Sequence, residues 1–275
     1  MESGITRRWE VKMYHVRLIG HFIRASVQQE LAYRANFFIN VLHTVLSLIT
    51  GILGIVVLFE QVNTINGWDF ASTLALLGVY LTLSALRRLF IGPSLDSLAG
   101  MDGDIWRGTL DFTLLRPVSK QFLVSVRMWE SFALVDLALG IGVLAAAVIE
   151  LEHTVSLTDM LIFTLTLITG VMLLYSILLI FVSLVFWSPG FMFTWVFDGI
   201  FQMARYPLDL YPGWLRLVLA WVIPVGIMTT VPAQALTGGL SAAFLLGHLL
   251  LTTGLFIGAS WFFRFALRRY ASASS

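Results

Sequence analysis

Several ionisable side chains lie within the long apolar segments of this sequence, and these are the residues that could do chemistry there. Asp136, Asp198, His43 and His248 are inside such segments, and Arg205 follows Asp198 by seven residues. A charge that faces lipid is costly, so each group should contact another polar group inside the protein. Pairing, substrate contact, proton transfer and metal binding are the chemistries such groups support.

The spacing favours pairing over the other chemistries. We predict that Asp136 pairs with an arginine of the N-terminal segment, with substrate contact as the alternative. Asp198 should pair with a residue of another helix, because Arg205 is two helical turns away. The two histidines lack a second metal ligand at helical spacing, so we predict polar packing between helices.

Catalytic signatures are missing from the sequence. There is no Gly-x4-Gly-Lys-Ser/Thr motif, and the only lysines are Lys12 and Lys120. His-Glu-x-x-His, Gly-x-Ser-x-Gly and cysteine are also absent. We therefore predict no catalytic residue, no metal site and no bound cofactor in this chain, which should not be an enzyme by itself.

A polar loop, Arg107 to Lys120, separates two apolar segments. Gly108 and Pro117 bracket a short helix, while Thr109 and Asp111 sit where a helix start favours a cap and negative charge. Basic residues should hold the loop in the cytoplasm. The loop is therefore predicted to be a contact element between two spans.

Composition assigns the whole chain to the membrane. Of its 275 residues, 58% are hydrophobic and 12% charged, with a mean hydropathy of +0.88. That leaves too little polar surface to cover a soluble globule. The segments long enough to span, or nearly so, are Phe37 to Phe59, Ala71 to Ile91, Phe132 to Ile149, Met160 to Trp187 and Ala242 to Phe263.

Charge placement sets the expected orientation. Lys and Arg concentrate before the first span, around the polar loop and after the last span, whereas the turns at 60–69 and 150–159 have none. The positive-inside rule then places both termini in the cytoplasm. The absence of cysteine is compatible with a bacterial inner membrane. Residues 1–35 show the periodicity of a cytoplasmic amphipathic helix, either an interfacial anchor or a lever joined to the first span.

Two further apolar stretches leave the topology open. Residues 191–203 are short and contain Asp198, and residues 215–236 are interrupted by Pro224 and Pro232. With both ends inside, only one of these stretches can cross. We favour 191–203 as a short fifth span and 207–240 as a re-entrant hairpin bent at Pro224, giving six spans; a cytoplasmic helix at 191–203 is the alternative.

The loop Gly108-Thr-Leu-Asp-Phe-Thr-Leu-Leu-Arg-Pro-Val-Ser119 resembles the Gly-Thr-Leu-(Asp/Glu)…Leu-Leu…Pro-(Val/Ile)-Ser signature of type-2 ABC exporter permeases. Further similar stretches are Leu31-Ala-Tyr-Arg-Ala-Asn-Phe37, Ala204-Arg-Tyr-Pro-Leu208, Val222-Ile-Pro-Val-Gly226 and Thr229-Thr-Val-Pro-Ala233. The resemblance covers nearly the whole chain and indicates a small six-span subfamily. It implies one permease domain over 1–275, with a connecting helix at 1–35, a coupling helix within 92–128 and a re-entrant hairpin containing Pro224, Gly226 and Pro232.

The resemblance also implies partners. Two permeases, identical or related, would form the translocation pathway, and two copies of a separate P-loop ATPase would bind ATP and Mg²⁺; no nucleic acid is expected. Facing the ATPase would be Gly108, Pro117, the polar residues Thr109, Asp111 and Arg116, and the apolar residues Leu110, Leu114 and Leu115. A self-sufficient secondary carrier is the alternative, for which inverted repeats and a mid-membrane ionisable cluster would be typical.

Overall fold

The computed structural model describes residues 17–30, 34–100, 102–151 and 154–270, and within them the chain is helical without a β-strand. Its long helices are α2 (Arg34–Phe59), α3 (Phe70–Leu86), α8 (Ala133–Glu150), α9 (Leu157–Ser183) and α13 (Ala242–Leu267). Five segments are long and apolar enough to cross a membrane: Phe37–Phe59, Phe70–Asp96, Ala133–Glu150, Leu157–Phe186 and Ala242–Leu267. The predicted all-α membrane fold is confirmed.

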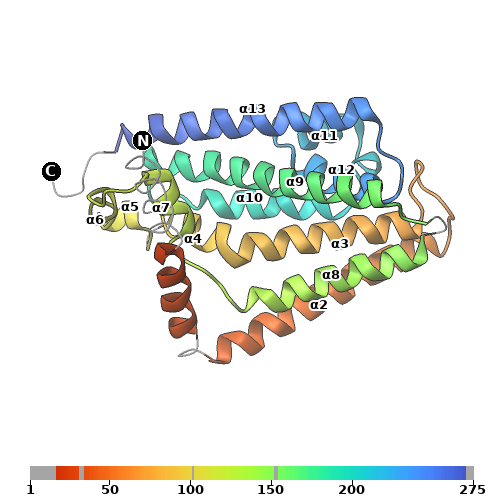
Figure 1. Cartoon of the computed structure of the whole chain (residues 1–275), viewed down its shortest axis with the longest axis horizontal. Helices are drawn as coiled ribbons and strands as arrows, with labels where there is room; N and C mark the ends of the chain where they lie inside the picture. Colours follow the sequence, from red (N-terminus) through yellow and green to blue (C-terminus); the bar gives the residue numbers. More distant parts are fainter. Residues whose placement is uncertain (1–16, 31–33, 101, 152–153, 271–275) are drawn as a thin grey trace, which may run out of the picture.

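The long helices lie side by side, and the short helices gather at one end of the bundle (Figure 1). That end, which we call the loop end, contains α4 (Gly92–Asp96), α5 (Asp104–Arg107), α6 (Leu110–Leu114) and α7 (Lys120–Val126). The helical extensions η1 (Arg87–Ile91) and η2 (Leu184–Phe186) continue α3 and α9 toward it.

Side-chain caps start the helices that run toward the loop end. Asp69 and Ser156 each form a capping box at the start of α3 and α9, and the Ser241 hydroxyl accepts from the Phe244 amide at the start of α13. These caps satisfy backbone amides that have no partner within the helix. All three begin at the end opposite the loop end, which we call the far end.

The loop between α2 and α3 and the end of α8 meet at the far end. Trp68, Asp69 and Leu151 line one cavity there. The two turns that carry no Lys or Arg, 60–69 and 150–159, therefore share one end of the bundle, as the charge pattern requires.

The segment after α9 runs from the loop end to the far end. Gly190 lies against the Trp106 ring, where an added Cβ would be 3.3 Å from Cζ3. After α10 (Phe193–Phe201) and η3 (Gln202–Arg205), Asp209 Oδ2 accepts from Trp68 Nε1 at 3.0 Å. The segment from Gly190 to Asp209 therefore connects the two ends of the bundle.

The following segment bends sharply and returns to the far end. After η4 (Leu208–Leu210), α11 (Gly213–Leu217) continues into η5 (Val218–Val222), which meets α12 (Val225–Leu236) at 89° beside Pro224. Gln234 and Gly239 line the same cavity as Trp68 and Asp209. Residues 207–240, predicted as a re-entrant hairpin, thus begin and end at the far end.

Two positions in the hairpin matter for its packing. An added Cβ on Gly226 would lie 2.2 Å from Leu208 Cδ2, so only glycine fits there without a shift of Leu208. Pro232 is inside α12 and is buried with its neighbours. The second arm, α12, is therefore enclosed by protein, as broken helices in a membrane need to be, whereas the first arm exposes Trp214, Leu217, Trp221 and Val222.

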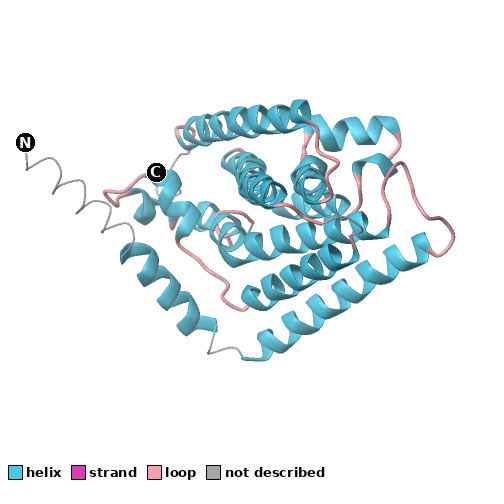
Figure 2. Ribbon diagram, turned by 45° about the vertical axis from the view of Figure 1, so that its right-hand side comes forward, coloured by secondary structure: helices cyan, strands magenta, loops and turns pink. Residues whose placement is uncertain are grey.

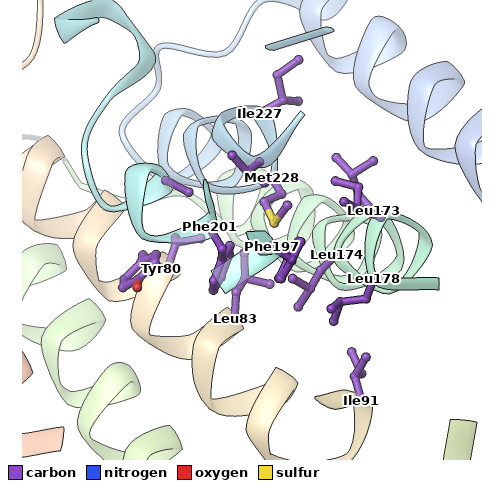
Figure 3. Packing of buried hydrophobic residues seen from close by; sticks show 14 of the residues in the cluster. Tyr80, Leu83, Ile91, Leu173, Leu174, Leu178, Phe197, Phe201, Ile227 and Met228 are labelled. Atoms are coloured by element: carbon purple, nitrogen blue, oxygen red, sulfur yellow. The ribbon is translucent and has the colours of Figure 1, made fainter. Parts of the chain in front are cut away.

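The apolar core lies between α3, α9, α10 and α12 (Figure 3). Leu83, Leu174, Phe197 and Met228 come from these four helices and are fully buried. Phe197 also stacks on Phe201, with ring centroids 5.6 Å apart. The short helices α10 and α12 are thus fixed in position by longer helices on both sides.

Glycines bring α3 and α8 into close contact. An added Cβ on Gly140 would lie 2.9 Å from the Thr82 backbone nitrogen, and one on Gly78 would lie 2.9 Å from the Leu144 backbone nitrogen. Small residues allow such approach between membrane helices, where packing replaces the hydrophobic effect. Gly142, on the same helix as Gly140, has no atom within 4 Å of its added Cβ.

We expect Gly140→Ala to destabilise the protein by about 1–3 kcal/mol, because the Thr82 backbone cannot move aside without a shift of α3. Gly142→Ala is the matched control and should be neutral or stabilising by up to about 1 kcal/mol through helix propensity. Thermal unfolding in detergent measures both. Equal stability of the two variants would contradict the close α3–α8 contact.

The helix at 17–30 leans away from the bundle at the loop end (Figure 2). Ile23 and Val27 are partly covered, whereas Arg24 and Gln28 are exposed, as the amphipathic pattern predicts. The Ser26 hydroxyl accepts from the Trp129 amide at 3.1 Å. Residues 1–16 and 31–33 of the predicted helix lie outside the described residues.

Candidate functional site

Two neighbouring arginines at the end of α3 point to different partners. Arg87 contacts Asp198 Oδ1 at 2.8 Å and Asp96 Oδ2 at 3.4 Å, while Arg88 contacts Asp136 Oδ2 at 2.7 Å and Glu130 Oε1 at 2.9 Å. Both arginines belong to η1, a π-helical turn. Such turns shift the register of side chains and often occur at functional sites.

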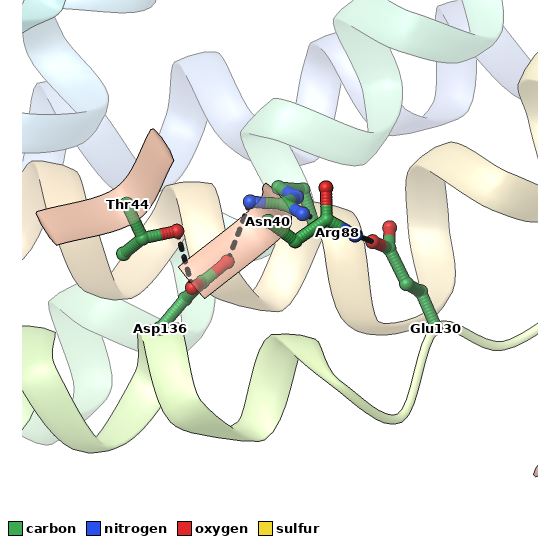
Figure 4. Close-up of polar contacts among 5 residues, drawn as sticks. All are labelled: Asn40, Thr44, Arg88, Glu130 and Asp136. Carbon is green, nitrogen blue, oxygen red and sulfur yellow. Dashed lines mark hydrogen bonds and ion pairs between the residues drawn. The ribbon is translucent and has the colours of Figure 1, made fainter. Parts of the chain in front are cut away.

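Asp136 is the most buried of these carboxylates, with 9% of its surface exposed. Its Oδ1 accepts from the Thr44 hydroxyl at 2.6 Å and its Oδ2 pairs with Arg88 (Figure 4). The predicted partner, an arginine of the N-terminal segment, is wrong for the described residues: Arg17 and Arg24 are exposed. The partner comes instead from the neighbouring helix α3, with which α8 is in close contact.

Asp198 pairs across helices, as predicted, and Arg205 does not join it. The Arg205 guanidinium donates to the Ser47 hydroxyl at 2.9 Å and lies 5.3 Å from the centre of the Tyr80 ring. The Arg205 side chain therefore lies between α2 and α3. In the described residues it forms no ion pair with a carboxylate.

These groups line one cavity of about 310 Å³ between α2, α3, α8 and α10. Its charged lining consists of Arg87, Arg88, Arg205, Asp136 and Asp198, and its uncharged polar lining includes His43, Tyr80, Thr44, Ser47, Ser84 and Gln202. The ion pairs of Arg87 and Arg88 lie toward the loop end of this cavity, whereas Arg205 contacts Ser47 and Tyr80 near the middle of α2 and α3.

The other predicted histidine has a packing role. His248 is buried between α13 and α9, with Nε2 2.8 Å from the Thr169 hydroxyl. No group of three or more possible metal ligands occurs in the part of the chain that the structure describes.

The polar loop forms the predicted short helix, α6. Gly108 ends α5 with a positive φ of 73°, a conformation that favours glycine, and Pro117 follows α6. The Thr109 hydroxyl donates to Asp104 Oδ1 at 2.7 Å rather than capping α6. Lys120 contacts the carbonyl oxygens of Leu114 and Arg116, which closes the end of α6.

The two sides of α6 differ sharply in burial. Leu110 is 1% exposed within the chain's own core, so it is not free to contact a partner as the resemblance implied. Leu114, for which the resemblance implied the same contact, is only partly covered by that core. Leu115 is 81% and Phe112 72% exposed. Trp106, on α5, is 55% exposed.

We call Trp106, Phe112, Leu115, Arg116 and Pro117 the exposed loop surface; all five are exposed. Sequence reasoning identified the last three and missed Trp106 and Phe112. Large apolar residues within an otherwise polar loop were the available signal for both.

The last helix ends beside this loop. Burial and the nearby carboxylates of Asp111 and Asp104 raise the pKa of the Tyr270 phenol. Arg127 pairs with Asp104, which connects the loop to the end of α7. The loop therefore lies beside the end of α13 and is paired with the end of α7.

Contacts of the helix at 17–30 reach the start of α8. Burial raises the pKa of the Glu30 carboxyl group, and the nearby polar groups of Ser131 offset part of this rise. Glu30 and Ser26 line a cavity of about 300 Å³ with Trp129 and Phe132. A movement of the segment after α7 would therefore be transmitted to this helix and to α2.

The long apolar helices define a multi-pass membrane protein. A family model described as "ABC-2 family transporter protein" matches residues 45–274, and the chain belongs to this family as a membrane permease component. The helix at 17–30 precedes the matched region. Searches of curated proteins and of solved structures found no match.

Proposed function

We propose that this chain is half of the translocation pathway of an ATP-driven ABC exporter and that its exposed loop surface binds a separate ATPase subunit. ATP and Mg²⁺ would bind to that subunit. The complex would contain two ATPase copies and two permeases, identical or related, with six spans in each permease and both termini in the cytoplasm of a bacterial cell.

One observation carries the proposal: α6 is anchored on one side by a buried leucine and presents large apolar side chains on the other. Phe112 and Leu115 are exposed and lie in the loop between two apolar helices, outside the residues that could span the membrane. Lipid tails would therefore not cover their side chains. Exposed apolar residues with a polar rim are typical of protein interfaces. Arg116 and Thr109 supply that rim.

The contacts of the loop explain how a push from the ATPase would reach the cavity. Arg127 joins α5 to α7, and Trp129 joins the following segment to the helix at 17–30. Glu130, in that same segment, pairs with Arg88, which also binds Asp136 in the cavity. A displacement of the loop would thus change the arrangement of the charged groups.

A second candidate, a self-sufficient secondary carrier, is favoured by one feature. Arg87, Arg88, Arg205, Asp136 and Asp198 lie scattered in the sequence but line one cavity. Ionisable clusters of this kind occur in ion-coupled transport. Each carboxylate is paired with an arginine, however, which favours a structural or gating role over proton exchange.

Assembly distinguishes the two candidates. We expect the chain, expressed with its genomic neighbours and purified gently in detergent, to be isolated with two copies of a P-loop ATPase and a second permease by native mass spectrometry. A stable species without an ATPase that transports in liposomes under an ion gradient would contradict the exporter proposal and support the secondary carrier.

A further inference from the structure

A basic groove lies on the outside of the bundle at the loop end, away from the charged cavity. Its volume is about 580 Å³, and it runs between the start of α7 and the last turns of α13. Figure 1 places both elements at the loop end, and the Gln121 amide donates to the Ser260 hydroxyl at 2.9 Å to join them. The groove is lined by Ser119, Lys120, Phe256, Ile257, Arg264 and Arg268, among others.

The charge of this groove is unbalanced. Lys120, Arg264 and Arg268 line it, and among the residues that the structure describes no Asp or Glu does. In the described residues none of the three forms an ion pair with a carboxylate. Arg264 uses its Nε to donate to the Ser260 carbonyl at 3.0 Å, and its terminal nitrogens form no hydrogen bond with the described residues. Two of the three arginines of the charged cavity, Arg87 and Arg88, differ from these residues, because both pair with carboxylates.

Polarity along the groove follows the order of groups in a phospholipid. Phe256 and Ile257 come first along α13, then Ser260, and then Arg264 and Arg268 toward the loop end. Ile257 is 62% exposed on the outside of the bundle, where acyl chains would lie. Basic pockets between membrane helices on the cytoplasmic side bind anionic headgroups.

We propose that this groove binds an anionic phospholipid, with the phosphodiester held by Lys120, Arg264 and Arg268 and an acyl chain along Phe256 and Ile257. Lys120 also contacts the carbonyl oxygens at the end of α6. A bound lipid would therefore connect α13 to the exposed loop surface. This inference needs only the membrane location and is independent of the ATPase.

The test measures lipid affinity of the full chain in detergent by native mass spectrometry, with phosphatidylglycerol and phosphatidylcholine as probes. Arg264→Gln/Arg268→Gln should weaken phosphatidylglycerol binding about 25-fold, because each basic residue near the membrane surface contributes a factor of about five. Arg107→Gln/Arg269→Gln is the control: it removes the same charge at the same end, from residues outside the groove. The control should change affinity by less than about threefold.

Three results would overturn the proposal. Equal weakening in both double variants would indicate general charge attraction, and equal binding of phosphatidylcholine would indicate an apolar groove alone. Competition by glycerol 3-phosphate as strong as that by the lipid would identify a soluble phosphoester as the ligand. Unchanged thermal unfolding midpoints of the variants verify that both remain folded.

Discussion

Leu115→Asp should weaken association with the ATPase subunit by at least about 30-fold while leaving membrane insertion intact. The side chain is 81% exposed, so the fold does not depend on it, and the new carboxylate would be buried without a partner in the proposed interface. Loss of a central apolar contact costs at least about 2 kcal/mol, which corresponds to about 30-fold in affinity. Adding Phe112→Asp should leave no measurable complex.

The measurement is co-purification of the ATPase with each variant, followed by binding affinity in detergent. Val62→Asp is the matched control, because Val62 is an exposed apolar residue of the loop at the far end. It should associate like the unaltered chain. Full association of the Phe112→Asp/Leu115→Asp variant would place the ATPase contact elsewhere. Leu110→Asp is unsuitable as a test, because a charge in the core would unfold the chain.

Arg88→Met should destabilise the protein more than any other single change proposed here. It leaves Asp136 buried with only the Thr44 hydroxyl, and it leaves Glu130 with only Asn40. Removal of one partner of a buried ion pair costs about 3–5 kcal/mol. We expect the thermal unfolding midpoint in detergent to fall by about 10 °C.

A double-mutant cycle measures the interaction energy between Arg88 and Asp136 separately from the contacts that each residue makes with its surroundings. Arg88→Met/Asp136→Leu removes both charges and should recover part of the lost stability, because neither charge then stays unpaired. Arg216→Met is the control: this arginine also pairs with a carboxylate, Asp209, but is half exposed, so its loss should cost less than about 1 kcal/mol. Equal effects of Arg88→Met and Arg216→Met would contradict a supporting role for the buried pair.

Local patterns in the sequence were sufficient to predict the main helices. The five apolar segments, the break at Pro224 and the amphipathic pattern around Ile23 and Val27 all correspond to what the structure contains. Hydropathy and helical periodicity are properties of neighbouring residues, so they can be read without knowledge of the fold. The short helix bracketed by Gly108 and Pro117 followed from turn and cap chemistry in the same way.

Partners across helices depended on the tertiary structure. That Asp136 needs a partner follows from its burial in an apolar segment; that the partner is Arg88 depends on the close α3–α8 contact and on the π turn that directs Arg87 and Arg88 apart. Residues in contact here are 48 positions apart. The inward direction of Arg205 likewise depends on how η3 lies against α2 and α3.

The sequence by itself determined that this protein is a helical membrane permease with a short helix in the loop between two spans. Only the tertiary structure decided which face of that helix is buried, placing Leu110 inside and Phe112 and Leu115 outside. The physical reason is length: α6 has five residues, less than two turns, so its apolar residues define no unique face until the core selects one.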